Sequence, residues 1–310
     1  MSETNQVRLY TLALLAVFIY GATPVFTKVA TVAVAADGVT VGALRAIVAA
    51  PIALFVILLG QHRIPLRRDA IILVLISGIG GLVLFPVFFS WGVQLTTAGH
   101  AAAGTAFGAV MAGIISALIE RRVPGWAWWV GIVIGTLGAI LLIWEAVGIE
   151  TVGVTWQGDA LVFLGMFFGV VGYISGARLT VEIGTTTVTM WSILVAAVCL
   201  LPVVVFYTGA DALIAIDTRG WGAILALGWG STILAYLFWN RALADGGVAK
   251  IGALQLLQPV VGIGLALLLL SEPLTTPLLI ATVVTLVGVV LVQRERRQRA
   301  GCPGTIPSNT

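Results

Sequence analysis

The sequence is dominated by ten apolar runs of roughly twenty residues, separated by short polar segments. A helix of that length crosses the hydrocarbon core of a bilayer, whereas a spanning β-strand needs only about half as many residues. Because unpaired backbone groups are costly in hydrocarbon, each run is predicted to be a helix. The runs cover residues 8–30, 39–59, 70–92, 98–119, 125–144, 158–177, 186–207, 220–240, 248–270 and 274–293. The chain is therefore predicted to be an all-α integral membrane protein with ten transmembrane helices.

Composition supports this fold class and argues against several functions. Charged residues make up 9% of the chain and hydrophobic residues 60%, whereas a soluble domain has about 25% charged residues. The formal net charge of +3 is too small to indicate nucleic-acid binding. Cys199 and Cys302 form neither a disulfide framework nor a metal-binding pattern. The sequence has no G-x-x-x-x-G-K phosphate loop, so we expect no ATP hydrolysis and no cofactor.

The basic residues between the runs predict the orientation. With the N-terminus inside, thirteen of the sixteen Lys and Arg residues lie on inner segments, and only Lys28, Arg45 and Arg219 do not. The outer segments carry acidic residues instead, among them Glu145, Asp159 and Glu272. The positive-inside rule then places both termini in the cytoplasm and predicts a multi-pass protein of the inner (plasma) membrane. Residues 294–310 are predicted to be a basic cytoplasmic segment followed by a disordered tail.

The two halves of the chain have similar patterns, which indicates a duplication. Trp91-Gly92 near the end of the third run corresponds to Trp239-Asn240 in the eighth, and Glu120 corresponds to Glu272. Residues 1–150 and 151–293 then form two five-helix repeats. Since five is odd, the second repeat must enter the membrane from the opposite side. Inverted repeats of this kind are typical of transporters.

The chain resembles the EamA-type branch of the drug/metabolite transporter superfamily. The resemblance rests on the stretch from Tyr20-Gly21 to Lys28, on Arg45 in the second run, and on the spacing from Pro259 to Glu272. One departure is Phe107, which stands where the second half has Pro259 and so removes the proline that would bend the fourth helix. The resemblance implies a carrier of small organic metabolites with a central cavity lined by helices one, three, four, six, eight and nine. It is most similar to exporters of aromatic and other neutral amino acids.

Polar and aromatic residues inside the runs are the candidates for substrate binding, because a transport path must be polar enough for its substrate. Gln255 and Gln258 share a helix face, and Pro259 frees a backbone carbonyl. The alternatives are a simple kink for this group, and helix packing or an interfacial aromatic belt for the other candidates. The predicted substrate-binding residues are Tyr20, Thr23, Pro24, Trp91, Gln94, Tyr173, Trp229, Tyr236, Trp239, Gln255, Gln258 and Pro259.

Ionisable residues within or beside the runs raise the question of coupling. We expect Arg45 and Lys28 to extend to the outer headgroups, with binding of a substrate carboxylate as the alternative. His100 is expected to be a solvated residue at an outer corner rather than a proton relay. No Asp or Glu lies in the middle of a run, which favours facilitated transport or exchange over proton coupling through a buried carboxylate.

Small residues follow one stripe in each of two runs, at four-residue spacing in the fourth and at three- or four-residue spacing in the sixth. Such stripes let helix backbones approach closely, either for static packing or for a moving gate. The stripes consist of Gly104, Gly108, Ala112 and Ser116, and of Gly165, Gly169, Gly172 and Gly176. Gly108 and Gly169 are predicted as gating positions.

The sequence thus favours a non-enzymatic carrier that works by alternating access. Its predicted partners are a small-molecule substrate and the lipid bilayer, with no nucleic acid, and it is expected to be a monomer or alternatively a dimer. A broad-specificity exporter of hydrophobic drugs is the main alternative. A membrane enzyme acting on lipid-linked substrates is a remote one, because the sequence lacks clustered Asp, Glu, His or Ser at a membrane face.

Overall fold

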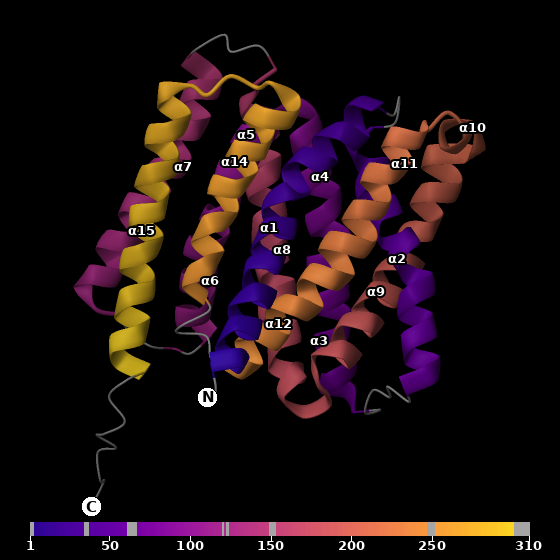
Figure 1. The fold of residues 1–310 in the computed structure, drawn as a ribbon, viewed down its shortest axis with the longest axis horizontal. Helices are drawn as coiled ribbons and strands as arrows, with labels where there is room; N and C mark the ends of the chain where they lie inside the picture. The colour runs from indigo at the N-terminus through magenta and orange to yellow at the C-terminus, as the bar shows by residue number, and fades with distance from the viewer. Residues whose placement is uncertain are drawn as a thin grey trace, which may run out of the picture.

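The computed structural model describes residues 3–33, 37–60, 67–119, 121, 124–148, 153–246 and 252–300. Within these ranges every regular element is a helix (Figure 1). Nine of the described helices are long and apolar enough to cross a membrane, and a shorter apolar helix covers Leu254–Leu270. The shorter helix is the ninth predicted run, whose first residues lie outside the described part of the chain. The predicted fold, ten membrane helices in two inverted repeats, is confirmed.

Several membrane helices are built from more than one segment. The first repeat consists of α1 (Glu3–Ala33), α2 (Gly38–Gly60), α3 (Arg68–Gly78) with η1 (Ile79–Leu84) and α4 (Phe85–Leu95), α5 (Ala98–Thr105) with α6 (Phe107–Ile119), and α7 (Trp126–Gly148). The second consists of α8 (Trp156–Ile183), α9 (Thr185–Pro202) with η2 (Val203–Thr208) and α10 (Gly209–Ile214), α11 (Thr218–Leu225) with η3 (Ala226–Leu234) and α12 (Ala235–Gly246), η4 (Gly252–Leu256) with α14 (Leu257–Leu270), and α15 (Thr276–Ala300).

The third and eighth membrane helices each contain a π-helical segment in mid-helix, and the seventh contains one as well, η2. The segments of the third and eighth helices are η1 and η3, and they occupy equivalent places in the two repeats. A π turn disrupts the regular hydrogen-bond ladder and is frequently found at functional sites. In η3 the hydroxyl of Thr232 donates to the carbonyl of Leu227, five residues earlier, at 3.1 Å. A polar side chain thus satisfies backbone in the irregular segment.

Contacts between the repeats follow the expected two-fold symmetry. The first helix of the first repeat, α1, packs against the eighth (α11, η3, α12) and ninth (α14) membrane helices. Equivalently, α8 opens the second repeat and packs against the third (α3, η1, α4) and fourth (α5, α6). Two further contacts join equivalent helices of the two repeats, α2 with α9 and α7 with α15. In addition, α1 begins and α15 ends at the same end of the bundle (Figure 1).

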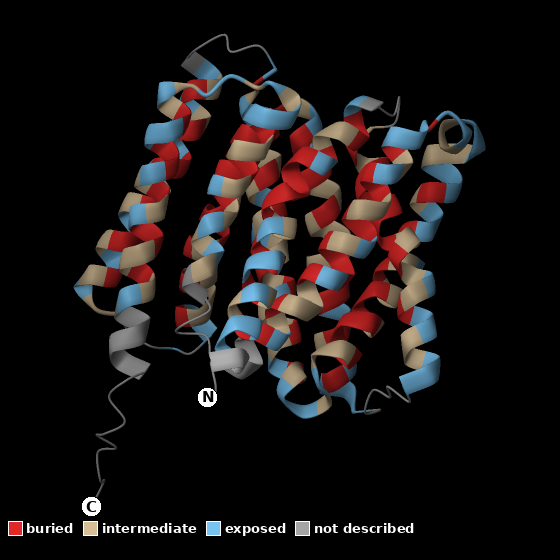
Figure 2. Cartoon of the chain, viewed as in Figure 1, coloured by how far each residue is buried: buried red, intermediate tan, exposed pale blue. Residues whose placement is uncertain are grey.

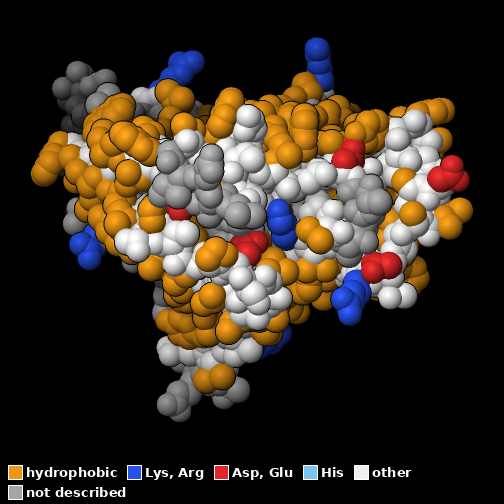
Figure 3. All heavy atoms as spheres, turned by 90° about the horizontal axis from the view of Figure 1, so that it is seen from above, with side chains coloured by type: hydrophobic (Ala, Val, Ile, Leu, Met, Phe, Trp, Pro, Cys, Tyr) orange, Lys and Arg blue, Asp and Glu red, His pale blue; other side chains and the backbone are white. Residues whose placement is uncertain are grey.

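Small residues bring α8 close to the third membrane helix. A Cβ atom added at Gly172 would collide with the backbone of Gly81, and one at Gly165 would lie 2.9 Å from the backbone nitrogen of Phe89. Buried residues lie on the faces between helices, whereas exposed ones lie on outer faces (Figure 2). Seen from above, hydrophobic side chains form most of the perimeter, and charged groups are few and scattered (Figure 3). This pattern fits a bundle whose solvent is lipid.

The fourth membrane helix is interrupted even though it has no proline at the bend. α5 ends at Thr105 and α6 begins at Phe107, with the amide of Ala106 bonded to the carbonyl of Ala103 at 3.1 Å. This tight i to i−3 bond is the geometry of a 3₁₀ turn. In the second repeat the corresponding place, before Pro259, is the 3₁₀ segment η4. The fourth membrane helix is therefore irregular at this place even though it has no proline there.

Candidate functional site

Arg45 of α2 lies at the centre of a polar cluster between the repeats. The residue is 5% exposed. Its Nε donates to the hydroxyl of Thr232 at 2.7 Å, and its Nη2 donates to the hydroxyl of Ser231 at 2.9 Å. Its Nη1 has no hydrogen-bond partner among the described residues. The prediction that Arg45 extends to the headgroups is wrong, because its polar partners are on η3, inside the bundle.

The cluster draws side chains from two further helices. The hydroxyl of Thr23 on α1 lies 2.8 Å from that of Ser231, and the ring of Phe85 on α4 has its centroid 5.7 Å from the guanidinium carbon of Arg45. We call Thr23, Arg45, Phe85, Ser231 and Thr232 the Arg45 cluster. It joins α1, α2 and α4 of the first repeat to η3 of the second, so relative motion of the repeats must affect it.

Four of the predicted substrate-binding aromatics lie near this cluster. Tyr20 lies within electrostatic range of Arg45, Tyr173 and Tyr236, so residues of the first, second, sixth and eighth membrane helices come together here. The indole nitrogen of Trp229 donates to the carbonyl of Val48 at 2.8 Å, one helical turn from Arg45 on α2. Together with Thr23, these residues form the part of the predicted site that the fold assembles.

The other predicted residues have different partners. Trp239 is buried in a cluster with Leu9 and Val17 of α1, and Tyr20 packs against the same cluster. The side chain of Gln94 accepts a hydrogen bond from the amide of Gly38, at the start of α2, at 2.7 Å. Trp91, three residues before Gln94 on α4, is exposed. Pro24 is buried within α1, next to Thr23.

The predicted group in the ninth membrane helix lines a separate small cavity. Gln255, Gln258 and Pro259 face Thr105 and Ala106 across it. The cavity therefore lies at the bend of the fourth membrane helix and not at Arg45. A Cβ atom added at Gly21 of α1 would lie 2.8 Å from the backbone carbonyl oxygen of Gln258, so the two helices approach closely there. The structure thus divides the predicted site into two groups.

Lys28 also has partners inside the protein. Its Nζ donates to three backbone carbonyls around the end of α4, those of Val93 at 3.0 Å, Gln94 at 3.4 Å and Thr96 at 2.5 Å. The last carbonyls of a helix lack intrahelical partners and carry partial negative charge. Lys28 of α1 therefore caps α4, so the prediction that it extends to the headgroups is wrong as well.

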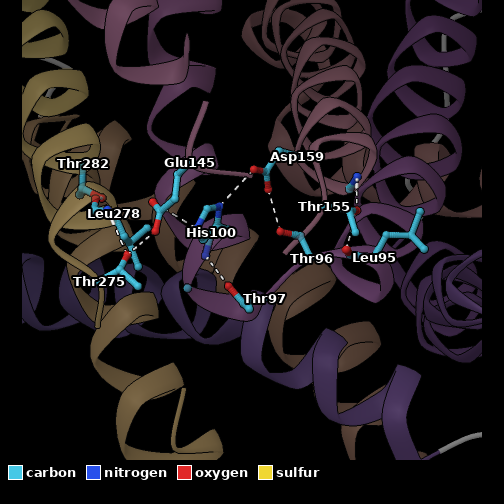
Figure 4. A network of polar contacts seen from close by, with 12 residues as sticks. Leu95, Thr96, Thr97, His100, Glu145, Thr155, Asp159, Thr275, Leu278 and Thr282 are labelled. Carbon is cyan, nitrogen blue, oxygen red and sulfur yellow. Dashed lines mark hydrogen bonds and ion pairs between the residues drawn. The ribbon is translucent and has the colours of Figure 1, made fainter. Parts of the chain in front are cut away.

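A second polar cluster surrounds His100, which was predicted to be solvated but is only 3% exposed. Its Nδ1 lies 3.1 Å from a carboxylate oxygen of Asp159 on α8, and its Nε2 lies 3.5 Å from one of Glu145 on α7 (Figure 4). Both carboxylates are also buried. The expectation of a solvated corner is wrong because α5, α7 and α8 close around it.

Each carboxylate of this cluster has a second donor. The hydroxyl of Thr96, at the end of α4, donates to Asp159 at 2.8 Å, and that of Thr275, just before α15, donates to Glu145 at 2.5 Å. We call these five residues the His100 network. Glu272 lies nearby and accepts hydrogen bonds from the first amides of α5, those of Ala98 and Gly99, at 2.9 and 2.8 Å.

Sequence reasoning missed the His100 network. Glu145 lies just after its apolar run and Asp159 just inside the next, so both appeared to be loop residues. The available signal was an acidic residue at each of two helix ends and a histidine in the first turn of a third. Among the described residues no group of three His, Cys, Asp or Glu side chains is placed to hold a metal ion.

The fold and its buried polar cluster define a class of protein: a multi-pass membrane carrier built from inverted repeats. Comparison with known protein families identifies one family that matches both repeats. Residues 8–144 and 156–294 each match the family described as EamA-like transporter family. The chain therefore belongs to the EamA-like transporter family and is a membrane transporter of small molecules.

Similar proteins are named as transporters, and their names give no substrate. The chain is 27% identical over 250 residues to the uncharacterized transporter YdeK of Bacillus subtilis, covering 81% of this chain and 85% of that protein. It is 24% identical over 258 residues to an uncharacterized transporter of Archaeoglobus fulgidus, covering 83% and 89%. A solved crystal structure matches with a TM-score of 0.63 and 18% identity, over 95% of this chain and 99% of that one, and supports the fold.

Proposed function

We propose that the protein is a secondary transporter that moves aromatic or other neutral amino acids by alternating access. The observation that carries this proposal is the Arg45 cluster, which joins the two repeats through buried polar groups in a largely apolar bundle. Irregular backbone at membrane depth is tolerated where it is covered by protein or lines a cavity. The π segment η3 supplies such backbone at this position.

The mechanism follows from the symmetry. If one repeat tilts against the other, contacts of α1 with the eighth membrane helix loosen at one end while equivalent contacts of α8 with the third tighten. The substrate then binds near Arg45, with Tyr20, Tyr173 and Trp229 providing aromatic surfaces. Inverted repeats support this exchange because the pseudo-two-fold axis that relates the repeats also relates the two conformations.

We propose facilitated transport or exchange rather than coupling to protons through a carboxylate at mid-membrane. Asp159 and Glu145, the buried carboxylates of the His100 network, lie near one end of the bundle and are already paired with His100 and hydroxyl groups. The topology proposed is inner-membrane with both termini cytoplasmic. We keep the boundaries 1–150 and 151–293 for the repeats and 294–310 for the tail, and expect a monomer or a dimer.

Uptake into liposomes containing the purified protein tests this function. Labelled tryptophan, phenylalanine, threonine and alanine are offered with and without a proton gradient. We expect saturable uptake that needs no gradient and is reduced by Trp229→Ala, which removes one of the proposed aromatic surfaces near Arg45. Trp156→Ala changes an exposed tryptophan at the start of α8 and is the matched control. Absence of uptake of all four amino acids would contradict the proposed substrate class, and strict dependence on the gradient would contradict the mechanism.

A broad-specificity exporter of hydrophobic drugs is the second candidate. Trp91, Tyr173 and Trp229 are large aromatic residues that are 41 to 44% exposed within membrane helices, and such surfaces bind many apolar compounds. Competition separates the two functions. Inhibition of tryptophan uptake by unrelated hydrophobic cations would favour the exporter, whereas inhibition confined to amino acids would favour the carrier.

Gly108 and Gly169 remain proposed gate positions. A Cβ at Gly108 would collide with the methyl group of Met166, and one at Gly169 would lie 3.2 Å from the ring of Phe85. We expect Gly108→Leu and Gly169→Leu to abolish uptake while the protein is still produced. Gly264→Leu is the control, because a Cβ there meets nothing within 4 Å. Unchanged uptake in the first two variants would exclude a gate at these positions.

A further inference from the structure

We propose that Arg45 binds the carboxylate of the transported solute, so that the site selects small monocarboxylates with an apolar or aromatic remainder. This inference rests on the proposed transport function and deepens it. Three features of Arg45 support it: its charge, its free donors and its surroundings.

Arg45 lacks a counter-charge within the described part of the chain. No carboxylate there lies within 4.0 Å of its guanidinium group, whereas Arg67 and His100 both have carboxylate partners within that distance. Its contacts are two neutral hydroxyl groups and an aromatic ring. Buried charges in proteins are normally paired, because removing an ion from water is costly. An anion from outside the chain would complete the pair.

Arg45 has N–H donors that its two hydroxyl partners leave unused. A guanidinium group has five N–H donors. Thr232 and Ser231 use one on Nε and one on Nη2, which leaves the second hydrogen of Nη2 and both of Nη1. Nη1 and Nη2 together form the end of the planar fork that binds a carboxylate through two parallel hydrogen bonds. The hydrogen bonds to Ser231 and Thr232 hold that fork in a fixed direction.

Aromatic side chains lie near the guanidinium group of Arg45. The ring of Phe85 has its centroid 5.7 Å from the guanidinium carbon, and Tyr20 lies within electrostatic range. Trp229 is held by its bond to Val48 one turn along α2. A carboxylate at the fork would therefore place the rest of the solute among aromatic rings. This combination fits an aromatic amino acid better than a hydrophilic dianion.

The test compares acids with their amides. Purified protein in detergent is titrated with tryptophan, phenylalanine, alanine, threonine and benzoate, and with the corresponding amides, and binding is measured by thermal stabilisation and calorimetry. We expect the acids to bind and the amides to bind on the order of 100-fold more weakly, since removing one partner of a charged pair is costly. Arg45→Met should lose the preference for acids, and Arg45→Lys should weaken it about 10-fold because it lacks the fork.

A second readout separates binding from structure. Replacing an uncompensated buried charge with an apolar residue of similar size is often neutral or stabilising. We therefore expect ligand-free Arg45→Met to melt at the same temperature as the wild type or higher. Arg219→Met changes an exposed arginine at the start of α11 and is the control. A lower melting temperature together with an unchanged preference for acids would overturn the proposal and make Arg45 a structural residue.

The remaining outcomes also decide. If no acid binds to the wild type, or if chloride stabilises it as well as the acids do, the carboxylate site is wrong. If acids bind through Arg45 but no solute enters liposomes, the site stands and the transport function fails. If transport is saturable but indifferent to the amides and to Arg45→Met, the function stands and this inference fails.

Discussion

The Arg45 cluster and the His100 network both bury charge between the repeats, but they differ in charge balance. In the His100 network an imidazole faces two carboxylates, and each carboxylate accepts a hydrogen bond from a hydroxyl group. In the Arg45 cluster a guanidinium faces only hydroxyl groups and a ring, and no carboxylate lies within ion-pair distance among the described residues. Both contain buried atoms without a hydrogen-bond partner, Nη1 in Arg45, and Nε2 of His100 with one carboxylate oxygen of Glu145 in the network. A network that contains opposite charges holds its helices together, whereas a buried charge without a counter-charge is a candidate for binding an anion.

Their positions fit this difference. The His100 network joins the ends of α4, α5, α7 and α8 to the start of α15 (Figure 4). The Arg45 cluster lies on a π-helical segment, where the backbone is irregular. We therefore expect changes in the network to reduce stability and changes in the cluster to reduce substrate binding.

The largest effect is expected for Asp159→Ala. It removes the carboxylate between His100 and Thr96, and leaves the imidazole and Glu145 as an incomplete buried pair. Breaking a buried pair in this way typically costs about 3–5 kcal/mol. The loss is measured as a lower melting temperature of the purified protein in detergent.

Asp211→Ala, in an exposed position on α10, is the control for Asp159→Ala and should change the melting temperature little. If Asp159→Ala instead kept the stability of the wild type and altered the dependence of uptake on pH, the His100 network would be part of the transport cycle. The division between the two clusters would then be wrong.

A smaller effect is expected for Lys28→Met, which tests an intermediate case. Lys28 is charged, but its partners are carbonyls at the end of α4 and not a carboxylate. Hydrogen bonds to charged groups contribute about 1.5–3 kcal/mol, so we expect a loss of stability within that range. The exposed Arg8→Met is the control. A loss of substrate affinity without a loss of stability would place Lys28 with Arg45 in function.

The fold was largely predictable from the sequence. Apolar length alone predicts membrane helices, because lipid requires every backbone group to be bonded within the helix. The inverted arrangement followed from counting five helices per repeat. The interruptions were not predictable: Phe107 gives no sign of the break at Ala106, and nothing in residues 226–234 distinguishes a π segment from an α-helix. Such details depend on packing between helices that are distant in sequence.

The candidate site was predictable only in part. Tyr20, Thr23 and Tyr236 were found because polar groups inside apolar runs are rare, and Arg45 was noticed for the same reason. Its partners Ser231 and Thr232 were missed, since short hydroxyl side chains are common in membrane helices. The expectation for Arg45 failed because its length allows two directions, toward the headgroups or toward η3, and the choice is made by tertiary contacts.

The smallest effect on stability is expected for Ser231→Ala. The hydroxyl of Ser231 accepts from the charged Arg45 and pairs with Thr23. A hydrogen bond to a charged group contributes about 1.5–3 kcal/mol, and we expect a loss at the lower end of that range because Thr232 still accepts from Arg45. The affinity for acids should nevertheless fall several-fold, because the fork of Arg45 loses one of its two supports, while the already weak affinity for amides should not change.

Ser175→Ala is the matched control for Ser231→Ala. The hydroxyl of Ser175 donates to the carbonyl of Val171 within α8 at 2.8 Å and does not contact Arg45. Both variants should lose less stability than Asp159→Ala does, and only Ser231→Ala should bind acids more weakly. If Ser231→Ala lowered the melting temperature as much as Asp159→Ala does, the Arg45 cluster would be holding the repeats together, and its free donors would have no role in selecting a carboxylate.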